Sequence, residues 1–141
     1  MIIGQAIDCY FENHKLELHQ LEFLHIHKTA KLIAASLKMG AIIAGLSDET
    51  QEKLYNFGID IGLLFQIQDD IIDETATEEE AGKTTNNDGN KNSFVNLLGL
   101  KEAITSADKL ANKCENSMNS FDENLQDNLK PLLNKYLYRH Q

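Results

Sequence analysis

A long run of apolar side chains at helical spacing, from Glu52 to about Asp73, limits most strongly what this chain can fold into. Apolar residues recur there at steps of three or four, which predicts a long helix with one buried face. The chain has no tryptophan and only ten phenylalanines and tyrosines together, which is little packing material for a β-sandwich. The sequence therefore predicts an all-α fold. The residues of the predicted buried stripe are Leu54, Phe57, Ile61, Leu64, Phe65, Gln68 and Ile72.

A second amphipathic pattern precedes this run, over Lys28 to Ala44. We expect this helix to end near Gly45, because glycine commonly follows the last turn of a helix. Ser47 then has the character of an N-cap, and the acidic residues after it suit the positive end of a helix dipole. Ser47 is therefore predicted to begin the long helix.

The remaining chain contains a polar, turn-rich stretch over residues 82–90, which predicts a surface loop. Two further helices are predicted, from Ser93 to Phe121 and from Asp122 to Arg139, with Pro131 kinking or breaking the second. No internal repeat and no interdomain linker is evident. We expect residues 1–141 to form a single all-helical domain.

The charge of the chain opposes several kinds of partner. The formal net charge is -9 and the pI about 4.9, so the overall field repels nucleic acid and anionic lipid surfaces. An anionic substrate would have to be captured by local lysines or through a metal ion. The most apolar stretch, Leu32 to Leu46, is interrupted by Lys38 and is too short to span a membrane.

Cysteine and histidine positions give no support for a zinc site or a disulfide framework. Cys9 and Cys114 are far apart and match no ligand spacing. His25 and His27 are two residues apart, so their rings point to different faces of a helix. We therefore expect no zinc, and a reducing, cytoplasmic location.

A cluster of acidic residues interrupts the long apolar run. Asp69 and Asp73 are four residues apart, so both carboxylates reach the same face of the helix, with Asp70 beside them. Carboxylate oxygens are the hard ligands that Mg²⁺ prefers, and Mg²⁺ often completes its shell with water and substrate phosphates. The alternative is a solvated acidic face. The apolar surroundings, Ile59 to Ile72, favour a binding site.

Two other phosphate or cation motifs fail on spacing. Gly82-Lys83-Thr84 resembles the end of a P-loop, but the first glycine of that motif would fall at Thr77. An EF-hand register through the same loop puts Thr84 at the first ligand and Val95 where a bidentate glutamate belongs. Neither motif is supported.

Four short motifs, taken in order, resemble the second half of the farnesyl and geranylgeranyl diphosphate synthases, the trans-isoprenyl diphosphate synthase family. The resemblance covers essentially the whole chain, and four motifs in the right order are more specific than any one. They are Gly4-Gln5-Ala6-Ile7-Asp8, His27-Lys28-Thr29-Ala30, Phe65 to Asp73, which is similar to the second aspartate-rich motif, and Ala81-Gly82-Lys83.

The resemblance implies the C-terminal half of an isoprenoid-synthase helical bundle. It also implies a prenyltransferase of isoprenoid biosynthesis, similar to farnesyl diphosphate synthase, that condenses an allylic diphosphate with isopentenyl diphosphate. Mg²⁺ would be the cofactor. Asp69, Asp70 and Asp73 would hold Mg²⁺ on the leaving diphosphate, and Asp8 would bind water coordinated to a metal ion.

The same resemblance assigns roles to the other motif residues. Lys28 and Lys83 would contact diphosphate oxygens as point charges. Thr29 and Gln66 would present neutral dipoles beside the reacting carbons, and Gln5 would line the opposite wall as a diphosphate-binding residue. Taken one at a time, these residues have ordinary alternatives, namely a solvated lysine, a helix threonine or a helix cap.

The chain departs from the family pattern in two ways. The first aspartate-rich motif and an arginine pair of the family lie upstream of the region equivalent to Met1. The loop also has Asn86-Asn87-Asp88 where the family usually has a glycine before the aspartate. We therefore expect half of a metal site, and a homodimer or association with a complementary N-terminal half. The alternative is a non-catalytic helical subunit or partner of a prenyl diphosphate synthase.

Overall fold

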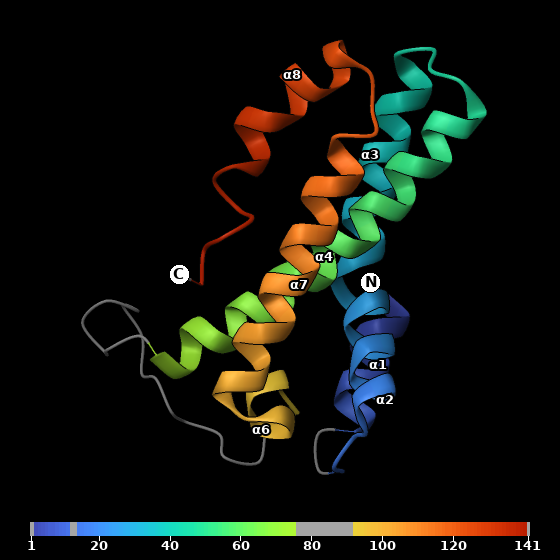
Figure 1. Ribbon diagram of the computed structural model, residues 1–141. Helices are drawn as coiled ribbons and strands as arrows, with labels where there is room; N and C mark the ends of the chain where they lie inside the picture. The colour runs from blue at the N-terminus through green and yellow to red at the C-terminus, as the bar shows by residue number, and fades with distance from the viewer. Residues whose placement is uncertain (1, 12–13, 76–91, 141) are drawn as a thin grey trace.

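Helices make up the fold, and the residues that the computed structural model describes, 2–11, 14–75 and 92–140, contain no strand (Figure 1). The all-α prediction is confirmed. Across these same ranges, no helix is long and apolar enough to cross a membrane. The elements are α1 (Ile2–Tyr10), α2 (Leu18–His25), the π-helical turn η1 (Ile26–Ala30), α3 (Lys31–Ile43), α4 (Asp48–Thr75), α6 (Phe94–Leu98), α7 (Leu100–Met118) and α8 (Glu123–Leu133).

Helix α4 forms the centre of the fold, because it packs against α3 along one side and α7 along another (Figure 1). Leu54, Phe57 and Leu64 are buried, as their spacing predicts, and Ile67 and Ile71 are buried as well. Because both α3 and α7 pack on α4, its buried face is wider than the single stripe that we predicted. Of the other residues in the predicted stripe, Gln68 is buried. Ile61, Phe65 and Ile72 are half-buried.

The turn between α3 and α4 has the predicted chemistry. Gly45 adopts a left-handed φ of 69°, and its N–H donates to the Ile42 carbonyl at 3.0 Å while the Leu46 N–H donates to Ala41 at 3.0 Å. This pair of bonds closes the last turn of α3. Ser47 Oγ accepts from the Thr50 N–H at 3.3 Å. The predicted helix end and helix start are therefore both confirmed.

Three predicted boundaries are wrong. The helix expected to begin at Lys28 begins at Leu18, because α2, η1 and α3 follow one another without a break. The helix expected over 93–121 is divided at Gly99, whose φ of 83° no helix accommodates. The helix expected to reach Arg139 ends at Leu133, two residues after Pro131, whose ring and missing N–H weaken its last turn.

Small side chains allow α7 to approach α4 closely. Ala103, Ala107 and Ala111 are fully buried, and an ion pair of 2.8 Å between Lys113 Nζ and Asp60 Oδ2 joins the two helices at the rim. Burial raises the pKa of Cys114 on the same face of α7 to about 12. This thiol therefore stays protonated and unreactive at neutral pH.

Candidate functional site

The π-helical turn η1 carries two of the predicted site residues, Lys28 and Thr29, both half-buried. Lys28 Nζ lies 2.5 Å from Asp8 Oδ2 of α1, and the two side chains are 32% and 34% exposed. Solvent therefore reaches the pair, and the lysine can exchange this partner for another anion. Helix α1 thus places the predicted carboxylate of Asp8 in contact with the predicted cation Lys28.

Gln66 on α4 contacts the other end of the same region. Its Oε1 lies 2.9 Å from Nδ1 of His25, the last residue of α2 before η1. An amide oxygen only accepts, so His25 donates from Nδ1 in this arrangement. The oxygen that we expected to face a reacting carbon is therefore held by the imidazole, and the resemblance gave no sign of this bond.

Asp69 lies about one turn beyond Gln66 on α4 and is bonded to a residue from the far end of the chain. Its Oδ1 accepts from Arg139 Nη2 at 2.8 Å, and the two side chains are 40% and 25% exposed. The guanidinium also lies over the Phe65 ring, 4.4 Å from its centroid, a cation–π geometry. Arg139 thus occupies one oxygen of the first aspartate of the cluster.

Asp70 has a structural role, because its Oδ2 accepts from the backbone N–H of Phe94 at 2.7 Å. The contact ties the start of α6 to α4, and Phe94 also stacks on the His25 ring with a centroid distance of 5.3 Å. Asp73 lies one turn beyond Asp69 and is half-buried. Asp69 therefore holds the segment after α8, whereas Asp70 holds the start of α6.

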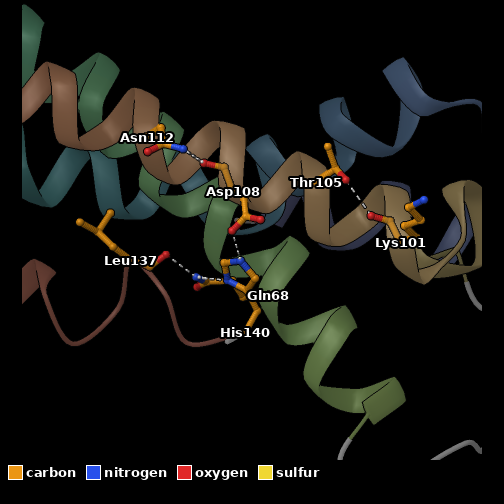
Figure 2. A network of polar contacts seen from close by, with 7 residues as sticks. All are labelled: Gln68, Lys101, Thr105, Asp108, Asn112, Leu137 and His140. Carbon is orange, nitrogen blue, oxygen red and sulfur yellow. Dashed lines mark hydrogen bonds and ion pairs between the residues drawn. The ribbon is translucent and has the colours of Figure 1, made fainter.

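A polar network behind the cluster joins α4, α7 and the segment that follows α8 (Figure 2). Gln68 is fully buried, and its Nε2 donates to the Leu137 carbonyl at 2.9 Å and lies 3.1 Å from His140 Nδ1. His140 Nε2 lies 3.1 Å from Asp108 Oδ1 of α7. The network therefore fixes residues 137–140 against α4, next to Asp69.

Of the remaining predicted residues, Gln5 lies apart from these contacts. Gln5 is exposed, and its Nε2 donates to Cys9 Sγ at 3.8 Å within α1. Lys83 lies outside the described residues, together with the Gly-Lys motif and its loop. Within the described ranges, the predicted set thus divides into a Lys28–Asp8 pair, a Gln66–His25 pair and the aspartates of α4.

The donor chemistry of the α4 carboxylates fits Mg²⁺, since all three aspartates offer hard oxygens and two are spaced at i and i+4. Across 2–11, 14–75 and 92–140, no three His, Cys, Asp or Glu side chains lie close enough together to hold an ion by themselves. The remaining ligands would come from water and from a diphosphate. Carboxylates that supply only part of a ligand shell are typical of Mg²⁺ sites that water and substrate phosphates complete.

Sequence reasoning missed Arg139 and His140 as neighbours of the aspartate cluster. One signal was present, because Arg139 is the only arginine of the chain and is followed directly by a histidine. Arginine is the preferred partner for a half-buried carboxylate. No periodicity links residue 139 to residue 69, however, so the pairing depends on how residues 134–140 fold back.

Comparison with known proteins decides the family. The family model described as polyprenyl synthetase matches residues 1–132. The chain belongs to the polyprenyl synthetase family. Among its curated relatives, geranylgeranyl pyrophosphate synthase 7 of Arabidopsis thaliana is 41% identical over 138 residues, covering 94% of this chain and 39% of that protein. The geranylgeranyl pyrophosphate synthase of Catharanthus roseus is 39% identical over 142 residues, covering 99% of this chain and 40% of that protein.

Solved structures of this family share the fold. A geranyltransferase from Helicobacter pylori, complexed with magnesium and isoprenyl diphosphate, superposes with a TM-score of 0.87 at 54% identity, over 96% of this chain and 46% of that one. A heptaprenyl diphosphate synthase from Staphylococcus aureus reaches a TM-score of 0.89 at 23% identity, over 99% of this chain and 56% of that one. The chain spans about two fifths of the length of these curated relatives.

We predict that Arg139→Gln loosens the contact of the segment after α8 with α4, while the bonds of Gln68 still hold Leu137 and His140. The substitution removes the charge that bonds Asp69 and stacks on Phe65, at a cost of about 1 kcal/mol for a half-exposed pair. Hydrogen–deuterium exchange should become faster in residues 134–140. Lys135→Gln is the matched control, since Lys135 is exposed and its loss removes the same charge. Equal exchange in the two variants would contradict the prediction.

Proposed function

We propose that this chain is the part of a prenyltransferase that binds Mg²⁺ and the leaving diphosphate, in an enzyme that joins an allylic diphosphate to isopentenyl diphosphate. The observation that supports it is the convergence of α1, η1 and α4. Asp8 reaches Lys28 at 2.5 Å, Gln66 reaches His25, the residue before η1, at 2.9 Å, and Asp69 follows Gln66 by roughly 4.5 Å along the helix axis.

The proposed chemistry follows from the residues in this region. Diphosphate is a poor leaving group until its growing negative charge is neutralised, and bound Mg²⁺ supplies that neutralisation. Asp69 and Asp73 would hold the ion, with Asp70 keeping its bond to Phe94. Lys28 would exchange Asp8 for diphosphate oxygens as a point charge.

The remaining predicted residues have subsidiary roles in this proposal. Asp8 would accept hydrogen bonds from water on the metal ion once Lys28 has turned to the diphosphate. Thr29 would present a neutral dipole to the developing carbocation, and Gln66 would do the same once its oxygen turns from His25 to the substrate. Gln5 and Lys83 remain proposed diphosphate contacts. We propose no farnesyl-specific product, because the curated relatives quoted above carry geranylgeranyl names.

The partner that we propose is a complementary N-terminal half, or a second subunit that supplies the opposing metal ligands. The chain covers only 39–46% of the curated relatives and of the Helicobacter pylori structure, and large apolar side chains of α1 and α3 are exposed. Such a surface is costly in water and favours a covering partner. The exposed residues of these two helices include Ile2, Ile3, Tyr10, Leu32, Met39, Ile42 and Ile43.

We propose a cytoplasmic location. Both cysteines are free, and Cys9 is exposed, which suits a reducing compartment. The names of the plant relatives place those proteins in the chloroplast. Fractionation of cells expressing the native protein, with Cys9 alkylation as a redox readout, distinguishes the compartments.

Purified chain, Mg²⁺ and diphosphates provide the test of the proposed function. Calorimetry should detect binding of inorganic pyrophosphate that requires Mg²⁺, whereas the chain alone should turn over an allylic diphosphate and isopentenyl diphosphate only at background rate. Efficient turnover by this polypeptide alone would refute the half-site claim. A folded protein with no Mg²⁺-dependent pyrophosphate binding would overturn the proposal itself.

A further inference from the structure

Two glycines mark the places where other helices meet the backbone of η1. A Cβ built on Gly4 of α1 would lie 2.3 Å from the backbone nitrogen of Lys28 and 2.4 Å from the carbonyl carbon of His27. A Cβ built on Gly62 of α4 would lie 2.4 Å from Cα of Ala30. The π-helical turn is therefore held between two glycine contacts, one from α1 and one from α4.

These contacts involve backbone atoms, which a change of rotamer cannot move. Any side chain at Gly4 or Gly62 must push η1 itself, or push α1 or α4 away from it. A π-turn also adds a residue to the helical repeat, so it sets the direction of the side chains that it carries relative to those of α3. A shift of η1 would therefore change where Lys28 and Thr29 point.

We propose that Gly4 and Gly62 are positioning residues that fix η1, so that Lys28 faces the bound diphosphate and Thr29 faces the reacting carbons. The proposal rests on the function proposed above, because it takes Lys28 as a diphosphate contact. Gly4 belongs to the Gly4-to-Asp8 motif, and Gly62 lies one turn before Gln66 on α4. Gly4 thus lets α1, which carries Asp8, lie directly against η1, and Gly62 does the same for α4, which carries Gln66.

Gly58 supplies an internal control for this proposal. It lies one turn before Gly62 on α4 and packs equally tightly, since a Cβ there would lie 2.5 Å from Cα of Ala34. Ala34 belongs to the regular helix α3, outside η1. Gly58→Ala should therefore disturb the packing of α3 on α4 as much as Gly62→Ala, while leaving the π-turn in place.

The experiment compares Gly4→Ala, Gly62→Ala and Gly58→Ala, with Gly40→Ala as a control at a site that has no atom within 4 Å. Calorimetry with inorganic pyrophosphate and Mg²⁺, well below the melting temperature, should show affinity about tenfold weaker or more for Gly4→Ala and Gly62→Ala. Gly58→Ala should lower the melting temperature as much as Gly62→Ala and bind pyrophosphate like the unmodified chain.

Hydrogen exchange supplies a second readout that does not depend on ligand binding. Exchange over Ile26 to Lys31 should become faster in Gly4→Ala and Gly62→Ala and stay unchanged in Gly58→Ala. If Gly62→Ala does not fold, Gly4→Ala carries the test, because its contact lies outside the α3–α4 interface. Equal loss of affinity in Gly58→Ala, or unchanged exchange over the turn in Gly4→Ala, would overturn the proposal. Absence of pyrophosphate binding by the unmodified chain would refute the proposed function and leave the exchange result to judge the turn.

Discussion

Replacing Asp69 and Asp73 together by asparagine is expected to weaken Mg²⁺-dependent binding of pyrophosphate by on the order of 100-fold or more. The physical reason is that both hard anionic ligands at i and i+4 are lost, while neutral amide oxygens attract a divalent cation weakly. The fold should survive, because the Asp69–Arg139 pair is half-exposed and two like charges at this spacing repel by roughly 0.2–0.5 kcal/mol. Calorimetric titration of pyrophosphate at constant Mg²⁺ measures the effect.

The matched control for this double variant is Glu123→Gln with Asp127→Asn on α8. These two carboxylates are exposed and are also four residues apart on a helix. The control therefore removes the same charge at the same spacing, without touching α4. If both double variants lose affinity equally, the effect comes from overall charge and the aspartate cluster has no special role.

Truncating Phe94 to alanine is expected to lower the free energy of unfolding by about 3–5 kcal/mol, in the range of buried phenylalanine losses. The ring is only 1% exposed and stacks on His25, so its removal leaves a cavity beside the residue that bonds Gln66. Urea denaturation followed by circular dichroism measures the change. Pyrophosphate binding should weaken as well, because α6 then loses its hold beside Asp70.

Leu97→Ala in the same five-residue helix is the control for Phe94. Leu97 is 40% exposed, so its loss should change stability by well under half as much. Similar destabilisation by the two substitutions would show that α6 contributes through its helix propensity. The buried ring would then not be the anchor that we infer.

Much of the fold follows from local chemistry. The long helix was predicted because its apolar residues repeat at helical spacing, and the α3–α4 turn because glycine and serine have defined roles at helix ends. The break at Gly99 was missed, since one glycine inside a helical pattern is often tolerated. The π-turn was missed as well, because it depends on α1 and α4 packing against both sides of Ile26–Ala30.

For the candidate site as well, the sequence indicated some features and missed others. Lys28, Asp8 and Gln66 were predicted from the order of the motifs, and the aspartates also from their spacing, but the residues that they contact were not predicted. Gln68 was assigned to an apolar stripe, and it is buried, yet its bonds go to Leu137 and His140. These partners lie about 70 residues away in the sequence, so only the three-dimensional fold brings them to it.

The buried amide of Gln68 depends on residues 134–140 for its hydrogen-bond partners. Non-helical segments at the surface usually tolerate deletion, because few interior groups depend on them. Here the Leu137 carbonyl and the His140 ring satisfy a donor that no solvent reaches, and an orphaned interior donor costs about 1–3 kcal/mol. Deleting residues 134–140 would thus disturb α4 around Gln68, directly beside the aspartates, more than the surface from which the segment is removed.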